Sequence, residues 1–266
     1  MKRIASILIA LLLAASTSFG QLAQSGGGLP VPPTGGGGGS DSVAVVTTVA
    51  DYFVEGANGT TAATDPDPSG SNRAVFGSGA AIHSPASTID DLRYGGSGGT
   101  ALTKIGADEA FAFTDGAVAA FGIAPGPSGD TTIFGDWSGT PLMSYAGGVF
   151  LSGANQTTPF EGRTVADGVD GGSVSTMLAS VTVTGMTAGQ KAIAVLACSS
   201  LSASIDATTA VSGTTLLSDQ AFFFTGSMAF LYREAAGSSV TLEGNCNQTS
   251  ASGMSWKIIA VRINPA

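Results

Sequence analysis

The chain has 266 residues, of which only 11% are charged and 39 are glycine, a length that suits one large sandwich or two small domains. Hydrophobic residues make up 43% of it, which is enough for a real core and excludes disorder for most of the chain. The formal net charge of −9 argues against nucleic-acid binding, because an acidic surface repels phosphate backbones. Many small and β-branched residues with frequent glycine favour strands joined by turns.

Residues 1–20 have the three parts of a secretory signal peptide. They are a charged start at 2–3 (Lys-Arg), an apolar run at 4–15, and small residues around a cleavage site at 18–20 (Ser-Phe-Gly). We therefore expect a secreted or extracellular-surface protein that begins at Gln21 and has no membrane segment in its mature form. The alternative is an uncleaved anchor, or a hydrophobic arm buried in an assembly such as a virion.

Residues 21–41 predict a flexible linker, because they contain three prolines and a run of five glycines at 35–39. The remainder, 42–266, is expected to form a single β-sandwich domain.

Period-two hydrophobic patterns predict about a dozen short strands in this domain. In chain order they are 43–54, 73–82, 92–94, 101–105, 110–113, a hairpin over 118–137, 142–151, 177–184, 192–198, 221–224, 228–232, 240–243 and 256–263. Strands of this number and spacing predict an all-β fold, a two-sheet antiparallel β-sandwich.

Three of these segments have distinctive patterns. In the hairpin predicted for 118–137, two strands flank 125–130, where two prolines and two glycines cannot continue a strand. Met177, Ala179, Val181 and Val183 alternate with Leu178 and three hydroxyl residues at 180, 182 and 184, which is typical of a half-buried strand. Residues 192–198 are apolar throughout, as in a strand covered on both faces.

Several short motifs occur in a set order from about residue 72 to the C-terminus. They are Asn72-Arg73, Tyr94-Gly95-Gly96, the Leu-Thr-x-x-Gly step at 102–106, the Pro-x-x-x-Gly step at 125–129, the Gly-x-x-Gln-x-x-Pro step at 153–159, and the ending at 256–265. This order resembles a β-sandwich module of phage virion proteins and secreted bacterial surface proteins, although Ser97-Gly98-Gly99 is an insertion relative to it. The resemblance implies a jelly-roll-like fold and a non-catalytic structural or attachment role with no active site. It also implies self-association or contact with other structural subunits.

Catalytic and metal motifs are weak. His83 is the only histidine, and it lies upstream of Ser97 in the Gly-Gly-Ser-Gly-Gly stretch, whereas a nucleophile elbow needs a downstream histidine. We therefore expect no enzyme activity and no cofactor. Asp167 and Asp170 are weak calcium candidates within an acidic, glycine-rich stretch, as are, more faintly, the two aspartates at 65–67. The adjacent carboxylates at 90–91 and 108–109 point to opposite faces of a strand, so neither pair alone makes a glycosidase site.

A secreted carbohydrate-binding module is the alternative function. Trp137, Tyr145, Tyr52 and Tyr94 are candidates for stacking on a surface glycan, although most of the aromatic residues are expected in the core. The phenylalanine run at 222–224 places at least one ring outward if it is a strand, where it would serve equally as a contact between subunits.

The two cysteines, Cys198 and Cys246, each lie near the end of a predicted strand. Export would place them in an oxidising compartment, so we expect a disulfide between them. The alternative is two buried thiols, because free cysteine is among the most buried residue types.

Overall fold

The computed structural model describes residues 42–54, 59–60, 70–82, 87–111, 116–126, 132–139, 141, 143–222 and 225–266, with the backbone alone at 51–54, 59–60, 206–207 and 221–222. These residues form strands β1 to β18 and no helix, so none of the described elements is a helix able to cross a membrane. The predicted signal peptide, the linker and His83 lie outside the described residues.

The strands of the N-terminal half form two antiparallel sheets. The inner N sheet has the order β1 (Ala44–Val54), β10 (Met143–Ser152), β3 (Ala74–Ile82), β8 (Gly116–Ile123) and β6 (Thr103–Lys104), with β7 (Glu109–Ala110) also paired to β8. The outer N sheet has the order β2 (Gly59–Thr60), β9 (Ile133–Trp137), β4 (Ile89–Tyr94) and β5 (Thr100–Ala101).

The strands of the C-terminal half also form two antiparallel sheets. The inner C sheet has the order β11 (Phe160–Gly171), β18 (Gly253–Ile263), β13 (Lys191–Ser200), β16 (Gly226–Glu234) and β15 (Thr215–Phe222). The outer C sheet has the order β12 (Thr176–Thr184), β17 (Ser239–Gln248) and β14 (Ile205–Ala210).

The two halves share one strand order. If β5 to β7 are counted together as the fifth strand, both inner sheets contain the order first, eighth, third, sixth, and both outer sheets contain the order second, seventh, fourth. This is the eight-strand, two-sheet arrangement of a jelly roll. The expected all-β antiparallel sandwich fold is confirmed, but the described residues form four sheets and not the expected two, because the chain contains this arrangement twice.

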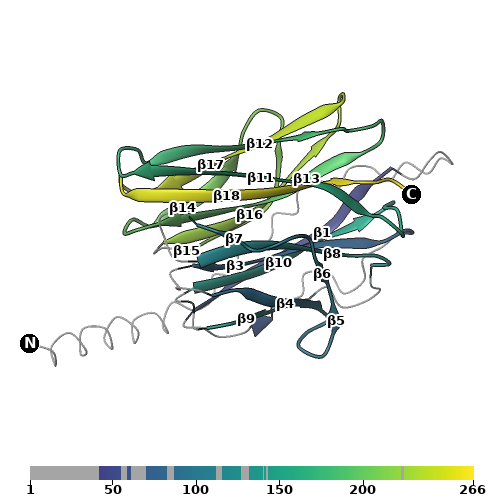
Figure 1. The fold of residues 1–266 in the computed structure, drawn as a ribbon, viewed down its shortest axis with the longest axis horizontal. Coiled ribbons are helices and arrows are strands. Elements are labelled where there is room, and N and C mark those ends of the chain that lie inside the picture. Colours follow the sequence, from purple (N-terminus) through teal and green to yellow (C-terminus); the bar gives the residue numbers. More distant parts are fainter. Residues whose placement is uncertain are drawn as a thin grey trace, which may run out of the picture. The chain divides into compact units, whose positions relative to one another are not determined.

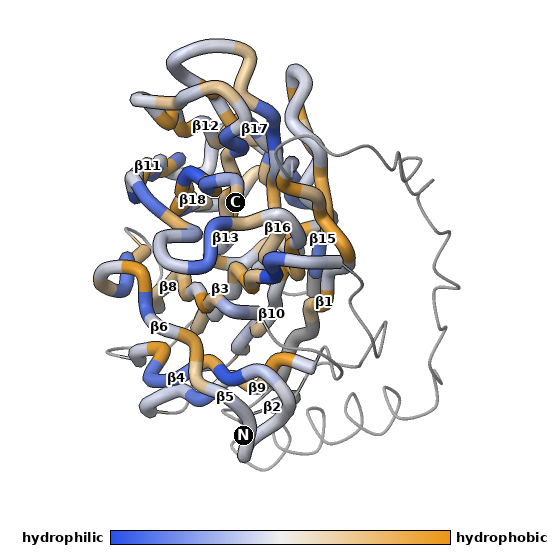
Figure 2. The backbone as a smooth tube through the Cα atoms, turned by 90° about the vertical axis from the view of Figure 1, so that its right-hand side faces the viewer, coloured by the Kyte–Doolittle hydropathy of each residue, from blue (hydrophilic) through white to orange (hydrophobic). Residues whose placement is uncertain are grey.

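The four sheets stack as layers, from β12 and β17 at the top of Figure 1 to β4 and β9 at the bottom. Figure 2 shows hydrophobic segments along the strands of these layers. One apolar cluster lies between each inner sheet and its outer sheet, and a third lies between the two inner sheets. The third cluster includes Phe76 of β3 and Phe230 of β16, whose rings meet edge to face at 6.1 Å. Inner strands such as β3 and β13 are therefore buried on both faces, which is why they read as continuous runs of small and apolar residues.

The contacts between the inner sheets are reciprocal. β3 packs on β13, its equivalent in the other half. β10 packs on β16 and β8 packs on β18. Because β10 corresponds to β18 and β8 corresponds to β16, these two contacts are the same contact with the halves exchanged. Reciprocal contacts of this kind are those of a two-fold, isologous interface. The chain is thus built as a covalent pair of sandwiches that meet face to face.

Gly77 on β3 shows why small residues are needed between the layers. A Cβ atom at this position would lie 2.5 Å from Leu92 Cδ2 and 2.8 Å from Leu102 Cδ2. The absence of a side chain lets β4 and the segment after it pack directly on the inner N sheet.

The hairpin predicted over residues 118–137 is wrong. Its two strands exist as β8 and β9, but β8 pairs in the inner N sheet and β9 in the outer N sheet. Phe121 of β8 and Ile133 of β9 enter the same apolar cluster from opposite sides. The shared apolar face that suggested a hairpin therefore reflects two strands facing each other across a sandwich.

The predicted patterns of β12 and β13 are confirmed. β12 buries Ala179, Val181 and Val183 and exposes residues on its other face, and every residue of β13 is buried. By contrast, β11 and β14 were not predicted, and most of β15 lies before the strand predicted at 221–224. β11 contains three glycines and four charged residues, which obscure the period-two pattern.

Candidate functional site

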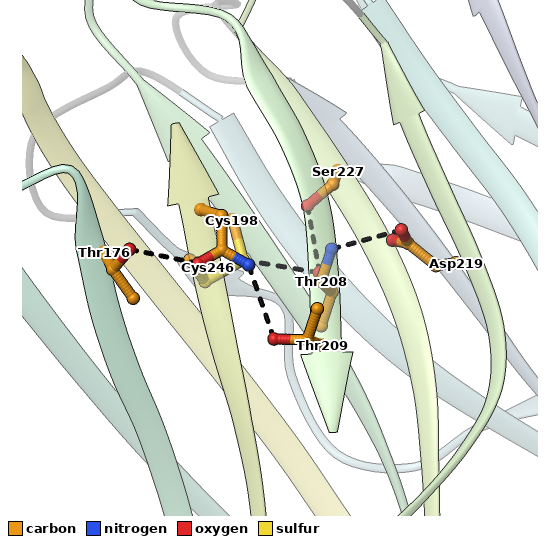
Figure 3. The surroundings of a disulfide bond; sticks show 8 residues. Thr176, Cys198, Thr208, Thr209, Asp219, Ser227 and Cys246 are labelled. Carbon is orange, nitrogen blue, oxygen red and sulfur yellow. Dashed lines mark hydrogen bonds between the residues drawn. A yellow bond between two sulfur atoms is a disulfide. The ribbon is translucent and has the colours of Figure 1, made fainter. Parts of the chain in front are cut away.

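Two cysteines and a set of polar side chains converge between the inner and outer C sheets (Figure 3). A disulfide joins Cys198 of β13 to Cys246 of β17, with the Cα atoms 5.9 Å apart. Both residues are fully buried. The bond therefore links the two sheets through the interior of the C-terminal sandwich.

Thr208 and Ser227 lie beside the disulfide because of strand register. Thr208 of β14 is opposite Cys246, and Ser227 of β16 is opposite Cys198. The Thr208 hydroxyl lies 4.0 Å from the Cys198 sulfur and 3.3 Å from the Ser227 hydroxyl. Asp219 of β15 completes the cluster, because its Oδ2 accepts a hydrogen bond of 3.1 Å from the Thr208 backbone N–H.

Asp219 is the one member of this cluster that titrates. Burial disfavours the charged carboxylate and raises the pKa of Asp219 to about 6, although hydrogen bonds from the backbone and side chain of Thr208 partly oppose the shift. Its other oxygen, Oδ1, is buried and has no hydrogen-bond partner among the described residues. In this half-buried residue, one carboxyl oxygen thus accepts the Thr208 N–H and the other is buried without a partner among the described residues.

A cluster of two hydroxyls and an acid with a raised pKa has the composition of a catalytic site, but its geometry does not support one. Thr208 is 1% exposed and Ser227 is 0% exposed, so a substrate cannot reach either hydroxyl. No member of the cluster is a histidine that could act as a base. Its evident effect is to tie together five strands of the C-terminal sandwich.

The two calcium candidates have other partners. The Asp170 carboxylate accepts hydrogen bonds from three backbone N–H groups of the turn after β11 and from the Ser173 hydroxyl. These bonds, with that of Ser173 the strongest, lower the pKa of Asp170 to about 2. Asp167 lies 3.6 Å from the ammonium group of Lys257 on the neighbouring strand.

In the described ranges, no three Asp, Glu, His or Cys side chains lie close enough together to hold a metal ion. The acidic pair at 65 and 67 lies outside those ranges.

The aromatic candidates for glycan binding are mostly internal. Tyr145 is fully buried, and its hydroxyl donates a 2.7 Å hydrogen bond to the carbonyl oxygen of Gly226 across the interface of the inner sheets. Trp137 is 5% exposed and Tyr94 is half-buried. The side chains of Tyr52 and of residues 222–224 lie outside the described part of the structure.

Most charged candidates form ion pairs. Asp91 pairs with Arg93, Asp108 with Lys104, and Glu109 of β7 with Arg163 of β11. The last of these pairs links the N-terminal half to the C-terminal half. In all, six of the eight basic residues in the described ranges are paired with an acid.

The sequence reasoning identified the two cysteines but missed Asp219, Thr208 and Ser227. An aspartate in a run of leucine and phenylalanine, LLSDQAFFF, was the one signal that could have indicated a buried carboxyl group.

Comparison with known proteins adds no relative. No protein-family model matches the chain, and no curated protein matches it significantly.

Proposed function

We propose that the protein is a non-catalytic structural or attachment subunit of an extracellular surface or a virion, of the tail-fibre, decoration or surface-filament kind. The observation that carries the proposal is the pair of jelly rolls joined through a common apolar core. Jelly rolls occur in viral capsid and lectin domains as well as in cupins, so the fold alone does not decide among these roles.

The use of the polar residues favours a structural role over catalysis. The cluster of Asp219, Thr208 and Ser227 fastens strands, and three of the four carboxylates at 90–91 and 108–109 are held in ion pairs. A domain with a buried disulfide and four stacked sheets resists local unfolding. This resistance suits a subunit exposed outside the cell.

Location and activity test this proposal together. The intact mass of the native protein should correspond to a chain that begins at Gln21, and the protein should fractionate with cell surfaces or virions. Purified protein should show no turnover in a broad esterase and glycosidase screen. Turnover that is abolished by His83→Ala, or by the loss of a single carboxylate, would overturn the proposal.

A carbohydrate-binding module is the second candidate, and the outer C sheet favours it. The outward side chains of Thr176, Asn247 and Thr209 form a hydrogen-bonded chain, with contacts of 3.1 and 3.4 Å. Hydroxyl and amide groups of this kind can bind sugar hydroxyls. A glycan array separates the two candidates, because a pure structural subunit should give no specific signal.

A further inference from the structure

Five edge strands in the described part of the chain are longer than two residues, and they differ in charge. They are β1, β11, β12, β14 and β15. Four of these contain at least one charged residue, whereas β12, with the sequence TMLASVTVT, contains none and has no proline. Natural proteins protect exposed sheet edges with charges, prolines or covering segments, and this nine-residue edge lacks the first two of these devices.

The two edges of this sheet differ in how their backbone groups are used. β14 lies against β15 and β12 lies against β11, so each is next to an edge strand of the inner C sheet. At β14, the carboxylate of Asp219 also accepts the Thr208 backbone N–H, whereas no such acid is present on β12. Among the described residues, β12 pairs with β17 alone. Figure 2 shows β12 at the border of the uppermost layer.

Exposed apolar side chains accompany this edge. Four large hydrophobic residues are exposed in the described ranges, and three of them, Val169, Val174 and Leu178, lie along the β11–β12 connection. Leu178, at 51% exposure, points outward from the middle of β12. Exposed apolar groups that gather next to a free edge mark an interaction surface.

We infer that β12 is a self-association edge, which pairs antiparallel with β12 of a second copy of this chain. A two-fold axis at Ser180 would place Ser180 opposite itself and Leu178 opposite Thr182. On the inner face it would place Met177 opposite Val183. Every inward position then meets an apolar residue and every outward position meets an uncharged one, so the strand is complementary to itself.

The net charge of the chain and the residue pattern of β12 favour a second copy of this chain as the strand that pairs with β12. Two chains with a net charge of −9 repel each other over most of their surfaces, but pairing through β12 places no like charges opposite one another. The pairing would join the outer C sheets of two copies into one continuous sheet by β-augmentation. This inference rests on the proposed structural role, since it names the surface through which subunits would meet.

Disulfide trapping in the full chain tests the pairing and its register. The native cysteines are bonded to each other, so a single new cysteine reports on its own surroundings. Ser180→Cys should form a covalent dimer under mild oxidation at least tenfold faster than Thr182→Cys, because only position 180 lies on the axis. A mixture of Thr176→Cys and Thr184→Cys should cross-link faster than either variant alone.

Sedimentation equilibrium gives an independent measure. Leu178→Lys should weaken the dimer at least tenfold, whereas the control Leu201→Lys, at a residue of 48% exposure outside the edge, should leave it unchanged. A monomer at all concentrations, or equal trapping at positions 180 and 182, would overturn the inference. These measurements use purified protein. Such a result would therefore reject β12 as a dimer contact, whereas the proposed function is tested separately by the location of the native protein.

Discussion

Replacing Asp219 by asparagine should flatten the dependence of stability on pH. In the folded protein, burial raises the pKa of Asp219 from 3.8 to about 6. The folded state therefore holds this proton more tightly than the unfolded state does. The resulting stabilisation is fully present below pH 3.8 and is lost as the pH rises through about 6.

The size of the effect follows from the same pKa difference. At about 1.4 kcal/mol per pKa unit, it corresponds to roughly 2 to 2.5 kcal/mol of unfolding free energy between pH 4 and pH 7.5. Burial is its largest cause, and the only other groups that contribute are the backbone and side chain of Thr208. Asp170 does not interfere in this range, because its pKa is lowered to about 2 and its contribution changes only at lower pH. Asparagine keeps an oxygen that can accept the Thr208 N–H but cannot ionise.

Guanidinium denaturation followed by tryptophan fluorescence, at several pH values from 4 to 7.5, measures the effect. The difference in unfolding free energy between Asp219→Asn and the native protein should change by about 2 to 2.5 kcal/mol over this range. Asp90→Asn, which removes an exposed carboxylate from β4, is the control and should run parallel to the native protein. A constant difference between Asp219→Asn and the native protein would refute the assignment of a buried, ionisable carboxyl group.

Three further predictions concern the disulfide and the packing. Titration of unfolded, unreduced protein should find no free thiol, and removing both Cys198 and Cys246 should cost about 4 kcal/mol of stability for a loop of 48 residues, as judged by denaturation. Gly77→Ala should destabilise by about 1 to 3 kcal/mol because its Cβ would overlap two leucines, whereas Gly98→Ala, where nothing lies within 4 Å, should be neutral in the same assay. Tyr145→Phe should cost about 1 to 3 kcal/mol, because it leaves the Gly226 carbonyl oxygen buried without the 2.7 Å bond, and unchanged stability would contradict this.

Strand patterns in the sequence predicted local structure well but not the pairing of strands. The alternation in β12 and the apolar run in β13 follow directly from burial on one face or on two. The same patterns carry no information on which strands are neighbours, so β8 and β9 were paired although they lie in different sheets. β11 was missed because an edge strand tolerates the charges and glycines that hide its periodicity.

In the candidate site, the sequence could predict the disulfide but not the polar cluster beside it. With two cysteines in the chain, one pairing was possible, and the structure contains it. Asp167 and Asp170 looked like a calcium loop because an edge strand and its turn have the same composition as one. Thr208, Ser227 and Asp219 converge only through the register of three strand pairs, which no local pattern reveals.

We propose that this pair of face-to-face jelly rolls is a structural subunit displayed outside the cell or on a virion. Immunogold electron microscopy of the native source, with antibodies raised against the folded protein, can test this location. Gold particles should lie on cell surfaces, surface filaments or virions. Labelling confined to the cell interior away from any assembly would contradict it.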